Sequence, residues 1–468
     1  MLRCALPLSV ALTVLCGGEI ALAARTTTPV AGDVRAVAFL GDALAIAHLP
    51  SRGGLTVERF VAGSPPQPLL GTTLRDADDQ VQLAGSAEAL AIGLQADADE
   101  RFGPSRVFVG PPSGPVREVA TCAAGLLAPP VAVSGARIAW REGGCGDPAA
   151  GPTAIVPASI VIGAADPAVA PARVALDPAV LPVSLVLAGA GGMVGALRPS
   201  FFALDCEVRS FSPLGVGATL LSERGGIASP VGELADGTRV FALSRLDGGD
   251  GDRVAMCPNT LFTIAADAPE RRALPTGGCP IDADVPTGPS SARIAADRVY
   301  ARVSDLSRSG SVHPPRVSLV SVRGDGGDRR VHVSGSYRPP LGFAAEGDRV
   351  AYWHRRCADA ATDVVLDGDA QSEGGAAIAS CRASVLTRAA RVLGGRIAVR
   401  LRCPSGCRGA ASDAAGARPR RLREFAFAPG THVLRLSLSR AMRRRARLRL
   451  ELAVENGPAR LAVIRLRR

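Results

Sequence analysis

The stretch Glu346-Gly347-Asp348-Arg349-Val350-Ala351-Tyr352-Trp353 sets the pattern of this chain. A polar Gly/Asp turn is followed by one basic residue and then by a run of apolar residues. Looser copies recur at 41–46, 135–140, 236–241 and 296–300. Apolar runs of this length next to such turns are typical of short buried strands. The recurrence predicts an architecture built from repeats and does not predict an activity.

Aligned on its first apolar residue, the phrase occurs seven times at intervals of 46 to 59 residues. The aligned positions are Leu44, Leu90, Ile138, Val194, Val240, Val299 and Val350. Repeats of about 40–50 residues with strand-like content are typical of a β-propeller, in which each repeat forms a four-stranded sheet. We therefore predict an all-β fold with about seven blades. Six or eight blades stay open, because 395–399 repeats the phrase once more.

The first copy illustrates the strand order expected in each blade. Its strands are predicted at 34–39, 44–49, 55–61 and 68–70. The sixth copy repeats this order at 292–294, 298–303, 316–322 and 330–333. The long connections after the second strands are rich in Gly, Asp and Pro, and we expect them to be surface loops.

The composition excludes wholesale disorder and favours many short strands. Apolar residues make up 47% of the chain and aromatic residues only 4%, with 53 Gly and 36 Pro. A length of 468 residues predicts two or three domains, or one array of repeats plus an appended domain. All 54 basic residues are Arg. We attribute this to genome base composition, so a single Arg counts little as a functional signal.

Residues 1–24 have the pattern of a secretory signal peptide. Arg3 precedes an apolar core at 5–15, and Ala21-Leu22-Ala23 has the form of an A-x-A cleavage site. The pattern predicts a secreted, extracytoplasmic protein, and association with the cell envelope would come from the basic C-terminal domain. A retained N-terminal anchor is the alternative, although the apolar core is short for a membrane span.

A basic C-terminal domain is predicted from a change in composition. Residues 386–468 contain 21 Arg and four acids, whereas the rest of the chain is net acidic. Strands are predicted there at 396–402, 424–427, 432–438, 447–454 and 460–466. Five short strands in about 80 residues fit a small β-sandwich better than another blade. The predicted segments are thus a signal peptide at 1–24, a propeller at 25–388 and a sandwich at 389–468.

Two stretches resemble known families. Gly347-Asp348-Arg349-Val350-Ala351-Tyr352 resembles the inner-strand signature of WD-like, TolB-type β-propellers, over roughly 30–385. The stretch 399–404, with Cys407, Gly409 and 425–430, resembles a C-terminal appendage of uncharacterised exported proteins from high-GC Gram-positive bacteria. That resemblance implies an immunoglobulin-like fold. Neither resemblance implies catalytic residues.

Export makes the nine cysteines beyond residue 24 candidates for disulfide bonds. Cys257 and Cys279 lie at the start of a third strand and just after the fourth strand of one predicted blade. Cys357 and Cys381 occupy the equivalent places in the last blade. Antiparallel neighbours bring such positions together, so we predict both pairs to be bonded.

The remaining cysteines allow two arrangements. Cys122 and Cys145 are predicted to join two blades, with Cys145–Cys206 as the competing pair. Cys403 and Cys407 would close a tight turn; zinc is the alternative for this pair, but no second ligand pair lies near it. Cys206 is then the odd thiol, and we expect a monomer unless Cys206 cross-links two chains.

No cofactor or metal is predicted. The sequence has no G-x-S-x-G, H-E-x-x-H or Walker-type loop. Asp247, Asp250 and Asp252 resemble a calcium loop in composition but lack its ligand spacing. His48 and His354 end equivalent strands of the first and last blades. One interpretation is a site that both histidines share. The favoured interpretation is that each histidine caps its strand.

The strongest charge feature is the run that contains Arg443, Arg444, Arg445, Arg447 and Arg449. From Arg447 onward, Arg alternates with Leu, which places the Arg side chains on the solvent face of a strand. One interpretation is a plain solvated face, and the other is contact with an anionic envelope surface. Nucleic acid is not expected as a partner, because no aromatic residues are interleaved for base stacking.

These features predict an exported, non-enzymatic propeller that serves as an interaction scaffold at the cell envelope. Its loop face would bind an unidentified protein or a cell-wall polymer. One alternative is an exported hydrolase or lyase that uses the propeller channel, and another is a carbohydrate- or peptide-binding module. The enzyme would need acids or histidines converging on the channel, whereas the predicted inner strands contain Ala, Val, Leu and Gly.

Overall fold

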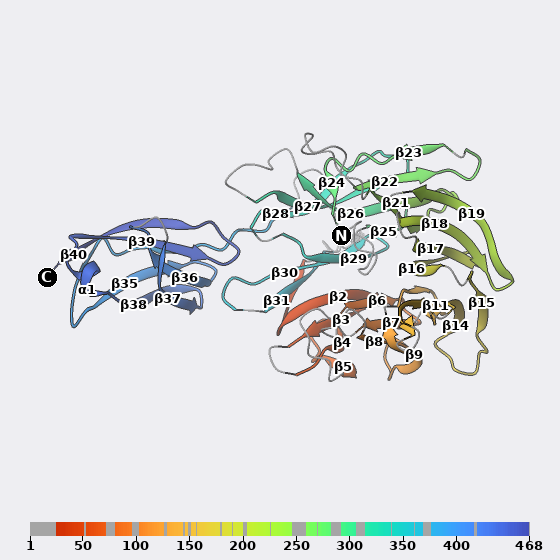
Figure 1. The fold of residues 1–468 in the computed structure, drawn as a ribbon, viewed down its shortest axis with the longest axis horizontal. Helices are drawn as coiled ribbons and strands as arrows, with labels where there is room; N and C mark the ends of the chain where they lie inside the picture. Colours follow the sequence, from red (N-terminus) through yellow and green to blue (C-terminus); the bar gives the residue numbers. More distant parts are fainter. Residues whose placement is uncertain are drawn as a thin grey trace, which may run out of the picture.

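The computed structural model shows a ring of seven β-sheets joined to a smaller two-sheet domain at one side (Figure 1). It describes residues 25–467 except 51–52, 72–79, 96–102, 126–128, 144–145, 148–150, 156, 178–179, 190, 200–203, 225, 246–258, 269, 282–291, 306–313, 338, 360, 368–375 and 416–418. The predicted signal peptide lies outside the described residues. The predicted fold class, a β-propeller followed by a β-sandwich, is confirmed.

The first, second, fourth and fifth blades each contain four consecutive antiparallel strands. Blade 1 contains β2 (Asp33–Leu40), β3 (Ala43–Leu49), β4 (Thr56–Phe60) and β5 (Gln67–Gly71), and blade 2 contains β6 (Gln80–Gly85), β7 (Leu90–Gln95), β8 (Gly103–Gly110) and β9 (Arg117–Gly125). Blade 4 contains β16 (Leu181–Ala188), β17 (Gly191–Pro199), β18 (Leu204–Ser212) and β19 (Gly215–Arg224), and blade 5 contains β20 (Gly226–Glu233), β21 (Arg239–Arg245), β22 (Asn259–Ile264) and β23 (Arg271–Ala273).

Blades 3 and 6 carry extra strands. Blade 3 contains β10 (Val131–Ser134), β11 (Arg137–Glu142), β14 (Ser159–Ala164) and β15 (Ala172–Ala175), with the hairpin β12 (Gly146–Asp147) and β13 (Gly151–Ile155) inserted after its second strand. Blade 6 contains β25 (Ala292–Ala295), β26 (Arg298–Asp305), β27 (Arg316–Arg323) and β28 (Arg330–Gly335). The short β24 (Cys279–Pro280) also pairs with β26, so Cys279 lies on blade 6 and not at the edge of blade 5.

Blade 7 is completed by the N-terminal strand. Its own segment supplies β29 (Gly342–Glu346), β30 (Arg349–Arg355) and β31 (Thr362–Asp367), and β1 (Thr26–Val30) is the fourth strand. Strand β1 pairs antiparallel with β31, with Thr26 opposite Leu366. This strand was not predicted from the sequence. The two ends of the propeller segment therefore share one sheet, which closes the ring.

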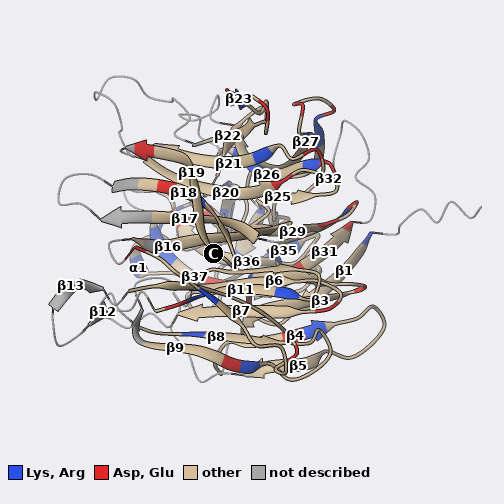
Figure 2. Cartoon of the chain, turned by 90° about the vertical axis from the view of Figure 1, so that its right-hand side faces the viewer, with Lys and Arg blue, Asp and Glu red and all other residues tan. Residues whose placement is uncertain are grey.

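The quoted phrase is apolar throughout because its strand is buried on both faces. Successive side chains of a strand point to opposite faces. Val350 and Tyr352 pack toward blade 6, whereas Ala351 and Trp353 pack toward blade 1. All four are less than 5% exposed. Most of each propeller strand accordingly carries neither basic nor acidic residues (Figure 2).

Seven hydrophobic clusters hold the ring together, one between each pair of neighbouring blades. Between blades 1 and 2, Ala45 of β3 meets Leu83 of β6. The last cluster joins Val30 and Ile46 to Trp353, across the point where the ring closes. The other five clusters lie between the remaining neighbours in order. Burial between blades is thus the main stabilising term, since no blade buries both of its faces alone.

Three polar contacts between blades lie at the turns of the inner hairpins. Ser86 Oγ donates to the Gly135 carbonyl at 2.7 Å, which links blade 2 to blade 3. The guanidinium of Arg137 donates to the Gly189 carbonyl of blade 4. Arg349 donates to the Gly41 carbonyl at 2.9 Å, which links blade 7 to blade 1. We call these three contacts the turn clasps.

The C-terminal domain is a sandwich of a three-stranded and a five-stranded sheet around one core. The first sheet contains β33 (Ser384–Val385), β35 (Arg396–Cys403) and β38 (Gly430–Ser437). The second contains β34 (Ala389–Arg391), β40 (Arg460–Arg467), β39 (Arg447–Val454), β36 (Cys407–Asp413) and β37 (Arg420–Phe427), with the single turn of α1 (Arg440–Arg443) between β38 and β39. Among the described residues, no helix is long and apolar enough to cross a bilayer.

The sandwich begins earlier than the predicted boundary at 388/389. Ser384 already pairs with Arg402 of β35. The linker before it contains β32 (Ala376–Ala377), which pairs in parallel with β28 at the outer edge of blade 6. The chain therefore runs back across blade 6 before it enters the sandwich.

A disulfide bond fastens the sandwich to the propeller. Cys357 lies in the loop after β30, and Cys381 lies in the linker, with the two Cα atoms 5.4 Å apart. Both cysteines are buried in the sandwich core, and the Cys381 amide donates to the Asn456 carbonyl at 2.9 Å. The predicted position of Cys381, just after a fourth strand of blade 7, is wrong, because β1 occupies that edge. The bond joins two domains.

We expect the double substitution Cys357→Ser/Cys381→Ser to loosen the sandwich from the propeller. The bond spans 24 residues of chain, and a loop of this size is worth about 3 kcal/mol in the chain-entropy model. Small-angle scattering should show a broader range of domain separations. Cys403→Ser/Cys407→Ser is the matched control, because that bond closes only four residues within the sandwich. An unchanged scattering profile would contradict the tethering role.

Candidate binding site in the central channel

The seven inner strands enclose a central channel. These strands are β2, β6, β10, β16, β20, β25 and β29, and each contacts the next around the whole ring. They line a cavity of about 330 Å³. Every blade contributes to it, so the site exists only when the ring is closed.

The side chains that line the cavity are mostly aliphatic, but the surface that the wall exposes to the channel is more polar than apolar. Gln82, Ser184, Glu233, Arg293 and Glu346 are its polar side chains among the described residues. Most of the others are Val, Ala and Leu, because each inner strand packs against both neighbouring blades. A wall of this composition suits a ligand that carries polar groups beside an apolar part.

Arg293 supplies the positive charge of the channel. It lies on β25, and its guanidinium donates to the Ala292 carbonyl at 3.1 Å. Burial lowers the pKa of Arg293 to about 10, so the side chain is still protonated at neutral pH. A cation held in a low-dielectric wall attracts an anion more strongly than the same cation would in water.

The two carboxylates of the wall are held by arginines of their own hairpins. Glu346 ends β29 and pairs with Arg349, while Glu233 ends β20 and lies 3.6 Å from Arg239. Both acids precede an inner turn, so they lie toward the turn end of the channel. Arg293 lies two residues before the end of its strand. An anionic ligand that enters from the turn end would therefore pass Glu346 and Glu233, whose charges are balanced by their arginines, before it meets Arg293.

Two uncharged polar groups complete the wall. The hydroxyl oxygen of Ser184 is buried and has no hydrogen-bond partner among the described residues. Gln82 is 8% exposed and lies on β6. Gln82 could bond to a polar group of a ligand in the channel, whereas the Ser184 hydroxyl lies against Gly195 of β17 and is not accessible from the channel.

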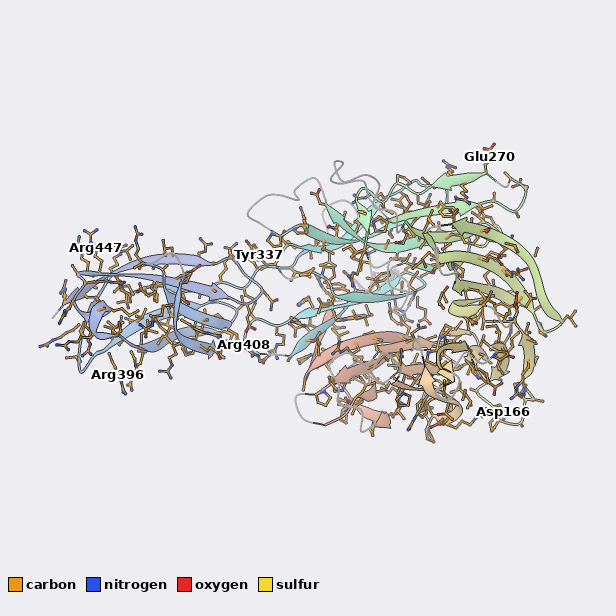
Figure 3. The ribbon with its side chains drawn as sticks, in the orientation of Figure 1. Asp166, Glu270, Tyr337, Arg396, Arg408 and Arg447 are labelled. Atoms are coloured by element: carbon orange, nitrogen blue, oxygen red, sulfur yellow. A yellow bond between two sulfur atoms is a disulfide. The ribbon has the colours of Figure 1, made fainter. Side chains whose placement is uncertain are left out.

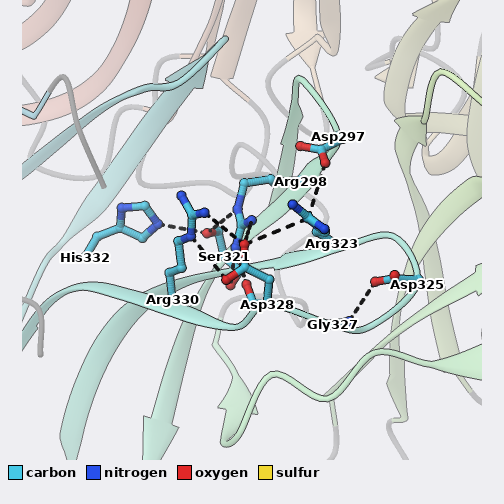
Figure 4. A network of polar contacts seen from close by, with 9 residues as sticks. All are labelled: Asp297, Arg298, Ser321, Arg323, Asp325, Gly327, Asp328, Arg330 and His332. Atoms are coloured by element: carbon cyan, nitrogen blue, oxygen red, sulfur yellow. Dashed lines mark hydrogen bonds and ion pairs between the residues drawn. The ribbon is translucent and has the colours of Figure 1, made fainter. Parts of the chain in front are cut away.

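A Ser–His pair exists elsewhere, in blade 6, and it is structural (Figure 4). His332 Nε2 lies 3.0 Å from Ser321 Oγ, and Arg298 Nε donates to the same oxygen at 2.9 Å. Burial lowers the pKa of His332 to about 4, so the ring is neutral. Ser321 is 0% exposed and His332 3%. A substrate cannot reach this serine without unfolding the blade.

Asp328 organises the same network at the β27–β28 turn. It accepts from Arg298 at 2.8 Å and lies 2.9 Å from Arg330. Its backbone has a positive φ of 44°, which these two ion pairs help to hold. Both arginines also lower the pKa of Asp328 by hydrogen bonding, with Arg330 the larger cause. The aspartate thus fixes a turn and does not orient His332.

The two histidines considered for a shared site have local partners. His48 Nδ1 lies 3.0 Å from the Ala31 carbonyl, and its Nε2 lies 3.0 Å from Glu58. His354 Nδ1 lies 3.3 Å from the carbonyl of Arg355. Over the described part of the chain, no group of three or more His, Cys, Asp or Glu is placed to hold a metal ion. The Asp-rich loop with Asp247 lies outside the described residues.

The predicted disulfide residues are placed as follows. Cys357 is bonded to Cys381 and Cys403 to Cys407. Cys122 and Cys279 are each disulfide-bonded. Their predicted partners, Cys145 and Cys257, lie outside the described residues.

Cys206 is a buried thiol inside a blade interface. It is 0% exposed, and its Sγ donates to the Ala228 carbonyl at 3.0 Å. Burial raises its pKa to about 11. A neutral, enclosed thiol is unreactive, so the proposed cross-link between two chains through Cys206 is not compatible with this fold.

The five predicted surface arginines do not form one patch. Arg445 donates to the buried Asp413 at 2.7 Å and so serves as its counter-ion. Arg443 belongs to α1, and its guanidinium lies against Gly395. Arg444 follows as the C-cap of that helix. Only Arg447 and Arg449 lie on the exposed face of a strand.

No family model matches this sequence, and no curated protein matches it. Similar solved structures exist. The β-propeller domain of the trilobed protease from Pyrococcus furiosus is 10% identical, with a TM-score of 0.46 over 74% of this chain and 96% of that domain. A structure from a study of two prolyl endopeptidases is 11% identical, with a TM-score of 0.46 over 79% of this chain and 53% of that one.

A puromycin-hydrolysing peptidase from Mycobacterium tuberculosis is 14% identical, with a TM-score of 0.45 over 79% of this chain and 58% of that one. The chain thus spans little more than half the length of these larger enzymes. At such identities the likeness concerns the fold alone. It nevertheless contradicts the prediction that the chain is not an enzyme, because propellers of this kind occur in peptidases. The absence of a recognised motif was no ground for excluding catalysis.

Proposed function

We propose that the propeller binds the carboxylate-bearing, apolar end of a peptide in its central channel. The observation that carries this proposal is Arg293, a charged guanidinium in the wall of a cavity formed by all seven blades. Guanidinium groups bind carboxylates in a two-pronged geometry. The aliphatic side chains in the wall would contact the apolar side chains of the peptide.

The size and polarity of the cavity support a short peptide segment. About 330 Å³ is at the small end of the range of ligand pockets. The side-chain amide of Gln82 can bond to peptide N–H and C=O groups.

We place this activity outside the cytoplasm. The support is the signal-like pattern of residues 1–24 and the disulfide bonds, since such bonds persist mainly in oxidising compartments. A propeller that captures peptide ends there would act on secreted or wall-associated peptides.

Calorimetric titration with the tripeptide Ala-Val-Leu tests the proposal. The free acid should bind, and its C-terminal amide should bind about ten- to a hundredfold more weakly, because a hydrogen bond to a charged group is worth about 1.5–3 kcal/mol. Arg293→Met should reduce binding of the acid to the level of the amide. Equal binding of acid and amide, or no binding of either, would contradict the proposal.

Arg272→Met is the matched control for this experiment. Arg272 is exposed on β23, at the outer edge of blade 5, so its loss removes the same charge without touching the channel. It should leave the affinity unchanged. Circular dichroism and thermal melting of both variants check that the ring is intact.

A further inference from the structure

The outer surface of the sandwich carries a group of exposed arginines. Only some of them belong to the predicted run 443–449. On the outer face of the five-stranded sheet, β34, β40 and β39 lie side by side in that order. Their exposed residues include Arg391, Arg465, Arg467, Arg447 and Arg449. We call these five residues the arginine face. The alternation of β39 fixes it, since Leu448 and Leu450 point into the core and are 0% exposed.

In two places on this sheet, two arginines lie directly opposite each other on neighbouring strands. Arg447 is directly opposite Arg465 in the antiparallel pair of β39 and β40. Arg391 is opposite Arg467 in the parallel pair of β34 and β40. Like charges directly opposite each other destabilise a sheet. Such repulsion is relieved when an anion lies between the two guanidinium groups.

The protein itself supplies little negative charge to this face. No ion pair involves any of its five arginines among the described residues. The nearby acids have other partners: Asp413 pairs with Arg445, Glu424 with Arg421 and Glu455 with Arg408. Glu451 lies further along β39, opposite Leu461.

The opposite side of the sandwich is also basic. Arg396, Arg400 and Arg402 of β35 and Arg435 of β38 are exposed on the three-stranded sheet. Figure 3 shows Arg396 and Arg447 on opposite sides of the domain. A flat membrane touches only one side of a domain at a time, whereas a flexible chain can run over both. The distribution therefore favours a linear polymer over a lipid surface.

We propose that the arginine face binds a linear phosphodiester polymer. Residues two apart on one strand are about 6.7 Å apart, and neighbouring strands about 4.8 Å. The face thus presents several guanidinium groups within a patch that a phosphodiester chain can follow from group to group. Guanidinium binds phosphate in a two-pronged geometry. The inference concerns the sandwich alone and does not rest on peptide binding in the channel.

The test uses the full chain and a linear poly(glycerol phosphate) at several salt concentrations. Arg447→Gln/Arg465→Gln should weaken binding about tenfold near physiological salt. It should also flatten the slope of log K against log salt by about 1.4, that is about 0.7 for each lost phosphate contact on a single-stranded polyanion. The melting temperature should stay equal or rise, because the repulsive pair is gone. Arg447→Lys/Arg465→Lys keeps both charges and should keep the slope.

Arg117→Gln/Arg272→Gln is the control, since both residues are exposed on outer strands of the propeller and the net charge falls equally. It should retain both affinity and slope. Three outcomes would each overturn the proposal. The slope could be unchanged in Arg447→Gln/Arg465→Gln, the control could lose affinity equally, or the chain could bind phosphatidylglycerol vesicles more tightly than the polymer.

Discussion

A chain that begins at Ala31, without β1, will be less stable than the chain that begins at Arg25 by about 3–5 kcal/mol. Five residues of β1 pair with β31. Val30 is 2% exposed in the cluster that joins blades 7 and 1. Arg25 also lies over the ring of Tyr352, 5.3 Å from its centroid. Loss of these contacts opens the ring and exposes β31 as an edge, which promotes aggregation.

Tryptophan fluorescence can locate this effect. The chain has only two tryptophans. Trp353 packs with Val30 in the closing cluster, whereas Trp140 lies between blades 2 and 3. In chains that carry Trp140→Phe, the fluorescence of Trp353 alone reports unfolding in urea. The chain that begins at Ala31 should then unfold at a lower urea concentration than the chain that begins at Arg25. If both chains unfold at the same urea concentration, β1 does not close the ring in solution.

The substitution Arg445→Leu should destabilise the sandwich by about 3 kcal/mol, because it leaves the buried Asp413 without its counter-ion. Asp413 is 4% exposed, and its contact with Arg445 is 2.7 Å. Its second carboxylate oxygen is buried without a partner among the described residues. A lone charge in that position has no compensation from water.

A double substitution separates this explanation from general damage. Asp413→Leu/Arg445→Leu removes both charges and should recover most of the lost stability, since an apolar pair of similar volume commonly replaces a buried ion pair without cost. Arg443→Leu is the control and should have little effect, because Arg443 forms no ion pair among the described residues. Guanidinium unfolding of the three variants measures the differences. A double variant as unstable as Arg445→Leu would refute the ion-pair explanation.

The inner hairpins were predictable because their signal is local. A Gly/Asp turn followed by a strand apolar on both faces appears within eight residues, as in 346–353. Strand β1 was missed because its partner Leu366 lies far along the sequence. Strand β36 was missed because Cys407–Asp413 is made mainly of small and polar residues. It is a strand because it lies between β37 and β39.

The candidate site was less predictable than the fold. Arg293 stands in an ordinary strand pattern and is one of 54 basic residues. Only the closed ring places it in a cavity. The pair Cys357–Cys381 was predicted, although from a wrong position for Cys381, and its role between two domains could not be predicted, since that depends on the path of the linker over blade 6. The basic run 443–449 is visible in the sequence. The structure separates its members, and it places Arg465 opposite Arg447 on the neighbouring strand.

The turn clasps have a consequence for how such a ring can change over generations. In each clasp the donor belongs to one blade, and the acceptor is a backbone carbonyl of the next blade's turn. Every residue type carries that carbonyl, so the acceptor does not depend on the side chains of the receiving repeat. Duplication or loss of a whole repeat would leave each remaining donor facing a turn of the same kind. These three contacts therefore place no demand on the side chains of the receiving repeat when a blade is gained or lost.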